Sequence, residues 1–190
     1  MALRRILEEC QTRQTEVIAV FVDFRKAVHS IAKDCILKIL SVYNVPTKIV
    51  NAVCALYKNT KASVVTSDGP TEDFETTSGV LQGDSLSPFL FVVVMDWVIR
   101  TAIPDDSKGF LLERRRSSRY PEKRLPILAY ADDLVLLASK VEAMQEMLDN
   151  LVIAASRVLK YLQSRRTLSY TSTTLTRRET NFAHIKRSVF

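Results

Sequence analysis

Apolar residues in this chain follow two periodicities, which alternate along the sequence. Residues 16–24, EVIAVFVDF, form a β-branched and aromatic run that predicts a buried strand. Residues 125–139, LPILAYADDLVLLAS, predict a strand, a turn and a second strand. Helical spacing of apolar residues predicts helices over 30–44, 46–57 and 141–162. Residues 88–103 predict a buried helix, although their β-branched content would also suit a strand.

The remaining segments carry weaker patterns. KASVVTS and TEDFETTS, within residues 61–78, predict two strands around the turn SDGP. Residues 104–126 are polar and basic, and they predict a surface loop. Ser139 and Glu142 have the spacing of a capping box at a helix start. TLSYTST, residues 167–173, fits one further strand.

Composition narrows the class of protein. The 190 residues suit one domain, and a hydrophobic share of 47% suffices for a sizeable core. Lys and Arg number 27 against 21 Asp and Glu, a net charge of +6 that fits a polyanionic partner but is only mildly basic. The three cysteines are scattered, so neither a zinc site nor a disulfide framework is indicated.

The sequence shows no pattern typical of a signal peptide or of a membrane-spanning helix. The first ten residues have no apolar core of signal-peptide length, and the longest apolar run, 89–99, is short and contains Asp96. A membrane span needs roughly 20 apolar residues. We therefore expect no signal peptide, no membrane contact, and a location in the cytoplasm or nucleus.

Asp132 and Asp133 stand out because carboxylates are costly to bury unless they are paired, hydrogen-bonded or bound to a metal. One interpretation is a plain hairpin turn, in which Asp is common. The other is a site for Mg²⁺ or Mn²⁺, since hard cations prefer carboxylate oxygens. Asp23, at the end of the other apolar strand, would supply a further ligand; its alternative role is a cap or turn residue before the next helix.

Three motifs carry a family resemblance. FVDFRKA (21–27), SGVLQGDSLSPFLF (78–91) and YADD (130–133) resemble, in this order, the palm motifs of reverse transcriptases, most closely those of non-LTR, LINE-type retrotransposons. The resemblance implies an α+β palm, an antiparallel sheet backed by helices in a split β-α-β, ferredoxin-like arrangement. It also implies RNA-directed DNA polymerase activity by two-metal nucleotidyl transfer, with an RNA template, a DNA primer and dNTP as partners.

The resemblance assigns roles to the residues of the first and third motifs. Asp23 and Asp132 would be the principal metal ligands, and Asp133 a supporting carboxylate. The backbone carbonyl of Phe24 would face the second metal. Tyr130 would pack near the primer terminus, or serve only as a strand aromatic.

The resemblance also assigns a nucleotide pocket. Gln82 and Gly83 would line it, the glycine allowing close backbone approach; an ordinary turn is the alternative. Arg25 and Lys26 lie where triphosphate oxygens are expected, and a solvated face is their alternative. Val28 stands where the family has an aromatic steric gate against ribonucleotides.

Departures from the family pattern leave other interpretations open. Ala27-Val28-His29 replaces the family's A-F-D, which weakens discrimination in favour of dNTPs or reflects drift in an unselected copy. Further on, a family Gly is missing and Arg166 stands where Lys is expected. A catalytically silent relic that binds nucleic acid is therefore the alternative function. A viral RNA-directed RNA polymerase palm is disfavoured, because YADD replaces G-D-D.

The expected organisation has three parts. Residues 1–15 would be an N-terminal remnant, 16–164 the palm, and 165–190 a basic tail that forms one strand and is then disordered. Fingers and thumb would be largely missing. The basic segment 113–124, ERRRSSRYPEKR, fits a phosphate-tracking loop, a nuclear localisation signal or a solvated loop. The pattern does not specify an oligomeric state.

Overall fold

The chain folds as two compact units in the computed structural model. The first unit comprises residues 1–25, 98–157 and 161–190, and the second comprises 26–97 and 158–160. The structure describes residues 2–24, 30–58, 60–67, 69–76, 78–80, 84–159, 168–175 and 185–188. Helix α5, Ser87–Ala102, contributes residues to both units.

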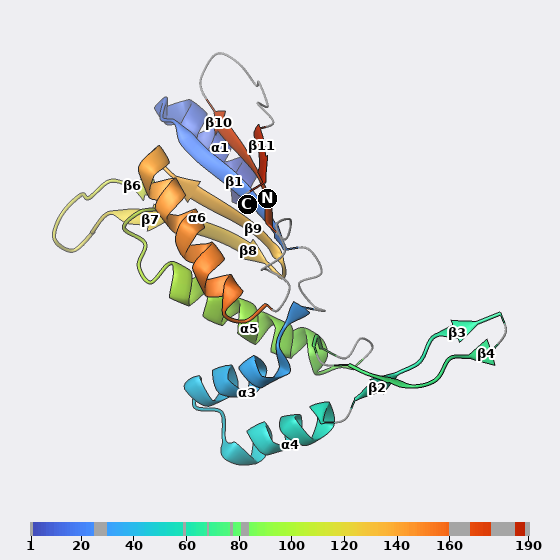
Figure 1. Cartoon of the computed structure of the whole chain (residues 1–190). Helices are drawn as coiled ribbons and strands as arrows, with labels where there is room; N and C mark the ends of the chain where they lie inside the picture. Colours follow the sequence, from blue (N-terminus) through green and yellow to red (C-terminus); the bar gives the residue numbers. More distant parts are fainter. Residues whose placement is uncertain are drawn as a thin grey trace. The chain divides into compact units, whose positions relative to one another are not determined.

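The first unit is built on one antiparallel sheet (Figure 1). Its strands lie in the order β11-β10-β1-β9-β8. Their bounds are β1 Val17–Phe24, β8 Ile127–Tyr130, β9 Asp133–Ala138, β10 Leu168–Leu175 and β11 Ile185–Ser188. Placement of β1 between the late strands β9 and β10 is the split β-α-β arrangement, so the predicted antiparallel sheet with helices is confirmed.

The central strands are apolar on both sides because both faces of the sheet are covered. On one face, Val17 and Ala19 of β1 and Leu137 of β9 are at most 2% exposed. On the other, the residues of β1 from Val20 on and those of β9 are buried at alternate positions, and helix α6, Val141–Ser156, packs against β9. In Figure 1 α6 crosses in front of the sheet, and α1 lies behind it. Two covered faces explain why these strands are continuous apolar runs.

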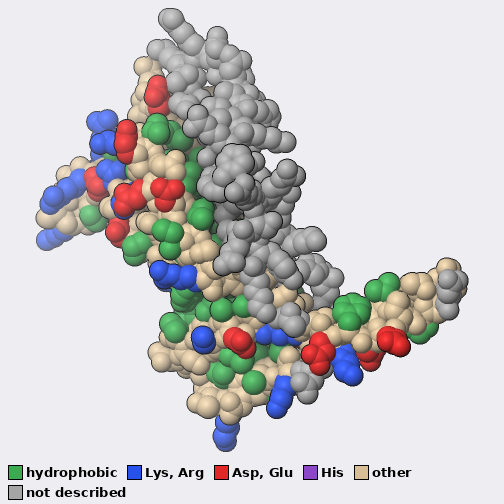
Figure 2. Space-filling view, viewed as in Figure 1, with side chains coloured by type: hydrophobic (Ala, Val, Ile, Leu, Met, Phe, Trp, Pro, Cys, Tyr) green, Lys and Arg blue, Asp and Glu red, His purple; other side chains and the backbone are tan. Residues whose placement is uncertain are grey.

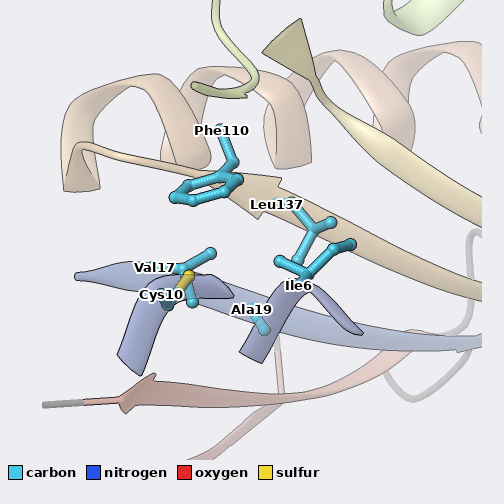
Figure 3. Close-up of a cluster of buried hydrophobic side chains, with 6 residues drawn as sticks. All are labelled: Ile6, Cys10, Val17, Ala19, Phe110 and Leu137. Carbon is cyan, nitrogen blue, oxygen red and sulfur yellow. The ribbon is translucent and has the colours of Figure 1, made fainter. Parts of the chain in front are cut away.

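Helix α1, Ala2–Arg13, was not expected from the sequence. Its buried side chains, Ile6 and Cys10, join the cluster drawn in Figure 3 with Val17, Ala19, Phe110 and Leu137. Leu3 and Leu7 pack against the same cluster. The spacing 3, 6, 7, 10 is one helical stripe, so the N-terminal segment is part of the core of the first unit.

Residues 104–126 contain a hairpin, which corrects the prediction of a surface loop. Strands β6, Phe110–Glu113, and β7, Lys123–Leu125, pair antiparallel with an irregularity between Leu111 and Glu113. Phe110 is 3% exposed in the core cluster. The base of the hairpin is therefore held by the sheet, and only its tip is a loop.

The predicted capping box is wrong. The residue before α6 is Lys140, and no side chain caps this helix. The Ser139 hydroxyl instead accepts a hydrogen bond from the Leu111 amide at 3.4 Å. The Ser139 hydroxyl, predicted to cap the helix, thus binds the β6–β7 hairpin instead.

The second unit contains helices α3, Lys33–Val42, and α4, Thr47–Tyr57, packed against each other. An extended hairpin follows, with β2 Lys61–Ala62 paired to β5 Phe74–Glu75 and β3 Val65–Thr66 paired to β4 Gly69–Pro70. The two strands are each interrupted, and the last two residues of the predicted turn SDGP already belong to β4.

Polar contacts fix the base of this hairpin. The Lys33 ammonium donates hydrogen bonds to the Thr60 hydroxyl and to the Thr76 carbonyl. Tyr57 and Ser87 share a buried hydrogen bond of 3.1 Å between α4 and the start of α5. Among the residues described, none of the helices is long and apolar enough to cross a membrane.

Candidate active site

The pairing of β1 with β9 sets the geometry of the aspartates. The register runs from Ile18 opposite Ala138 to Val22 opposite Leu134. The paired register ends there, and one further step would set Asp23 opposite Asp133. Residues directly opposite in an antiparallel pair have Cβ atoms about 4.5–5.5 Å apart and share a face of the sheet. Two carboxylate positions 110 residues apart in the sequence thus lie at the same end of the sheet.

The third aspartate lies in the adjoining turn. Tyr130 pairs with Asp133, so Ala131 and Asp132 are the two central residues of the β8–β9 hairpin. Ala131 has a φ of 52°, the left-handed region, while Asp132 does not have positive φ. Positive φ at the first central position alone is the pattern of a type II′ turn, which suits the twist of a hairpin. The turn holds Asp132 beside the end of β9.

Strand alternation places Phe21, Asp23, Tyr130 and Asp133 on the face of the sheet that α1 covers further along. Here that face is open: Phe21 is 42% exposed and Tyr130 is 83% exposed. Asp23 and Asp133 are exposed, and Asp132 is half-buried. Phe24 is buried on the opposite face, at 2% exposure, so only its backbone is available at this edge.

The donor set fits a hard divalent cation, because three carboxylates offer only oxygen ligands. The backbone positions fit as well, since Asp23, Asp132 and Asp133 share one sheet edge. Their side chains do not converge: among the described residues, no group of three or more His, Cys, Asp or Glu has the geometry of a metal site. Exposed carboxylates on adjacent positions repel each other and turn toward water.

Several predicted site residues lie outside the described residues. These are Arg25, Lys26, Val28 and the neighbouring His29 of the first motif, and Gln82 and Gly83 of the second. Their roles stay predictions. Residues 78–80 and 84–91 of the second motif are described, and there the Asp84 carboxylate accepts a hydrogen bond from the Leu86 amide at 3.2 Å ahead of α5.

Phe21 was missed as a candidate, although a signal was present. In the run VFVDF it stands two residues before Asp23, which in a strand means the same face. Phe21 and Tyr130 are both exposed, on the same face of the sheet as Asp23 and Asp133. Large aromatics left exposed beside charged groups suit contact with sugar or base rings.

Comparison with known proteins decides the family. A family model described as reverse transcriptase (RNA-dependent DNA polymerase) matches residues 1–164. The chain belongs to the reverse transcriptase family. The matched range contains all three aspartates and all three motifs on which the resemblance was based.

Within this family, the chain is similar in sequence to proteins of R2 retrotransposable elements. It is 30% identical over 149 residues to the Retrovirus-related Pol polyprotein from type-1 retrotransposable element R2 of Nasonia vitripennis. It is 32% identical over 127 residues to the corresponding polyprotein of type-2 element R2DM from Drosophila melanogaster. These matches cover 78% and 67% of this chain but only 14% and 11% of the relatives. The predicted likeness to non-LTR retrotransposon enzymes is confirmed.

Solved structures support the fold. An apo telomerase from Candida tropicalis, truncated from its C-terminal domain, matches with a TM-score of 0.60 at 12% identity, over 92% of this chain and 35% of that one. A Candida albicans telomerase in complex with a fragment of telomeric RNA matches with a TM-score of 0.58 at 11% identity, over 98% and 32%. At such identities the likeness concerns the fold alone.

Proposed function

We propose that this chain is the palm of an RNA-directed DNA polymerase from a non-LTR retrotransposon. Its reaction would join a primer 3′-hydroxyl to the α-phosphorus of a dNTP, with release of pyrophosphate. The proposal is supported by the register of β1 and β9, which leaves Asp23 and Asp133 at the same end of the sheet, next to the β8–β9 turn that contains Asp132. The family match and the R2 relatives support the same reaction.

The aspartates have distinct parts in this proposal. Asp23 and Asp132 would hold Mg²⁺ or Mn²⁺, with Asp133 as a supporting carboxylate and the Phe24 carbonyl as a further oxygen. When bound, the cations would activate the attacking hydroxyl and offset charge on the leaving pyrophosphate. The pairing of β1 with β9 keeps the backbones of Asp23 and Asp133 at one end of the sheet, so binding a cation would require their side chains to turn inward but not the strands to move.

The remaining assignments follow the family. Gln82 and Gly83 would line the nucleotide pocket, Arg25 and Lys26 would face the triphosphate, and Val28 would replace the steric gate. The partners would be an RNA template, a DNA primer and dNTP. The exposed aromatics Phe21 and Tyr130, on the same face as the carboxylates, offer a surface for the primer end. Cytoplasm or nucleus remains the expected compartment.

Primer extension on an RNA template with Mg²⁺ tests the activity, with a full-length R2 Pol polyprotein as positive control. We expect incorporation by this chain and its loss in Asp132→Asn. Loss of one metal ligand lowers rates by orders of magnitude, because charge on the reacting phosphate is no longer offset. Absence of product from this chain, while the polyprotein extends, would contradict polymerisation and leave the silent relic as the function.

Cation binding is tested without turnover. Titration of Mn²⁺ followed by electron paramagnetic resonance should show weaker binding in Asp23→Asn and in Asp132→Asn. Asp106→Asn is the matched control, because Asp106 is exposed in the same unit but away from the strand tips. Equal affinity in all four proteins would refute the assignment of ligands.

A further inference from the structure

The tip of the β6–β7 hairpin concentrates positive charge. Residues 113–124 hold six Lys or Arg and two Glu. Figure 2 shows Lys and Arg side chains gathered over this hairpin, at the left of the view. We call its outermost residues the arginine tip: Arg114, Arg115, Arg116, Arg119 and Tyr120.

The cations of the arginine tip are available to a ligand. Lys123 pairs with Glu113 at 3.3 Å, and Arg124 pairs with Glu122 at 2.8 Å, so both acids of the segment are engaged with the strand residues. The four tip arginines are exposed, and none of them forms an ion pair with another described residue. Four uncompensated charges on a few residues attract a polyanion.

The tip also has a defined backbone. The Arg116 amide donates to the Tyr120 carbonyl at 3.1 Å, and the Tyr120 amide donates to the Ser117 carbonyl at 3.2 Å. Below it, Gly109 approaches Pro126 so closely that an added Cβ would lie 2.5 Å from the proline nitrogen. A hairpin fixed at its base presents its charges with little loss of entropy on binding.

A groove adjoins the arginine tip. Its volume is about 740 Å³, and Arg13 of α1 lines it together with Arg114 and Arg116. Arg13 is held by the Leu112 carbonyl at 2.6 Å and by Glu9 at 2.6 Å. Glu16 and Glu113 also line the groove, which limits the attraction there and leaves the tip as its most positive part.

This surface lies at the other end of the sheet from the carboxylates. The groove reaches Glu16 and Ser139, which adjoin the first residue of β1 and the last of β9. Asp23 is near the far end of the eight-residue strand β1. At a rise of about 3.3 Å per residue, the separation is roughly 20 Å.

The chemistry of the tip favours nucleic acid over an acidic protein. Tyr120 is 69% exposed among the arginines. Arginine forks match phosphate oxygens, and an exposed aromatic ring stacks on an unpaired base. The carboxylates of an acidic peptide would pair with the arginines, but they carry no planar base for Tyr120 to stack on.

We propose that the arginine tip is a binding site for single-stranded RNA, separate from the carboxylate edge and independent of polymerisation. The arginines contact phosphates, and Tyr120 stacks on one base. RNA held here stays attached to the chain while another segment is at the carboxylates.

The test is fluorescence anisotropy of a labelled oligouridine of about 12 nucleotides, enough to span such a site, with the whole chain and a series of salt concentrations. Replacement of all four tip arginines by Ala should weaken binding more than tenfold and reduce the slope of log K against log salt by about 3. The control variant loses the same charge elsewhere, through alanine at Arg5, Lys38, Lys48 and Lys58, which are exposed. It should keep most of the affinity.

Two further arms separate the alternatives. Tyr120→Ala should weaken binding several-fold, whereas Tyr120→Phe should retain it. Asp132→Asn should bind RNA as the unchanged chain does, whatever its polymerase activity, so failure of the polymerase leaves this proposal standing. Equal losses in the tip and control variants would overturn it. So would equal binding of a polyglutamate peptide with no effect of Tyr120→Ala, which would indicate an acidic protein partner.

Discussion

The two ends of the β1–β9 pair differ in cover and in charge. At one end Val17 and Leu137 are fully buried under α1 and Phe110. At the other, on the same face, Phe21 is 42% exposed and the strands reach Asp23 and Asp133. The same two strands therefore form part of the core at one end and expose their side chains to solvent at the other.

This difference shows how a small sheet can carry neighbouring carboxylates that lower its stability. Like charges placed side by side weaken a strand pair. Here the apolar contacts further along β1 and β9 keep the register, so the carboxylate end needs no packing of its own. The covered end also carries the basic hairpin, so acidic and basic chemistry are kept at opposite ends of one sheet.

The largest expected contrast comes from the same substitution at both ends. Phe110→Ala removes a ring that is 3% exposed and should cost about 3–5 kcal/mol of unfolding free energy. Phe21→Ala removes a ring that is nearly half exposed and should cost about 1 kcal/mol. Urea denaturation of both variants measures the contrast. Equal costs would mean that the open end is as well packed as the covered one.

A close backbone contact at the covered end gives the next effect. Gly109→Ala places a Cβ 2.5 Å from the nitrogen of Pro126 and 2.6 Å from the carbonyl carbon of Leu125. Both are backbone atoms, so the hairpin must shift, at about 1–3 kcal/mol. Thermal unfolding should show a lower midpoint. A midpoint equal to that of the unchanged chain would indicate that the base of the hairpin is not held tightly.

A smaller effect is expected at the carboxylate end. Ala131 has a φ of 52°, which strains a residue with a Cβ by about 1–2 kcal/mol. Ala131→Gly removes this strain, which is larger than the entropic cost of glycine, so the variant should be more stable. Ala129→Gly, at an exposed position of strand β8, has only that cost, about 0.5–1 kcal/mol. Denaturation should therefore give opposite signs for the two variants. Destabilisation by both would contradict the strained turn.

The weakest expected effect is a pH dependence from the covered end. Burial raises the pKa of the Cys10 thiol above its usual 9.0. A raised pKa means that the unfolded chain ionises first, so this stabilisation is present below pH 9 and is lost as the pH rises above it. The decline in unfolding free energy between pH 8 and pH 10.5 should be shallower in Cys10→Ala. Parallel curves would contradict burial of the thiol.

Sequence patterns predicted the centre of the sheet because local and tertiary preferences agree there. β1, β8 and β9 are apolar runs bounded by polar residues, and YADD lies at the turn between two of them. The motifs predicted that Asp23, Asp132 and Asp133 share one site, which stays a prediction; β1 and β9 place Asp23 and Asp133 at the same end of the sheet. Whether their side chains hold a cation depends on rotamers that no motif specifies.

The missed features depend on contacts between distant segments. α1 is mostly polar. Its apolar stripe, Leu3, Ile6, Leu7 and Cys10, is buried only because it packs on β1 and β9. The β6–β7 hairpin has few apolar residues of its own, so pattern alone suggested a loop. Its formation depends on Phe110 entering the core cluster.

Cleavage of the backbone by Fe²⁺ with ascorbate and peroxide tests the central claim most directly, because hydroxyl radicals cut the chain near the bound ion. We predict two groups of cuts, one around Asp23 and one around residues 131–133. Excess Mg²⁺ and the variant Asp132→Asn should suppress both together. Cuts at one position only, or cuts that neither Mg²⁺ nor the variant reduces, would show that these strand ends do not form one cation site.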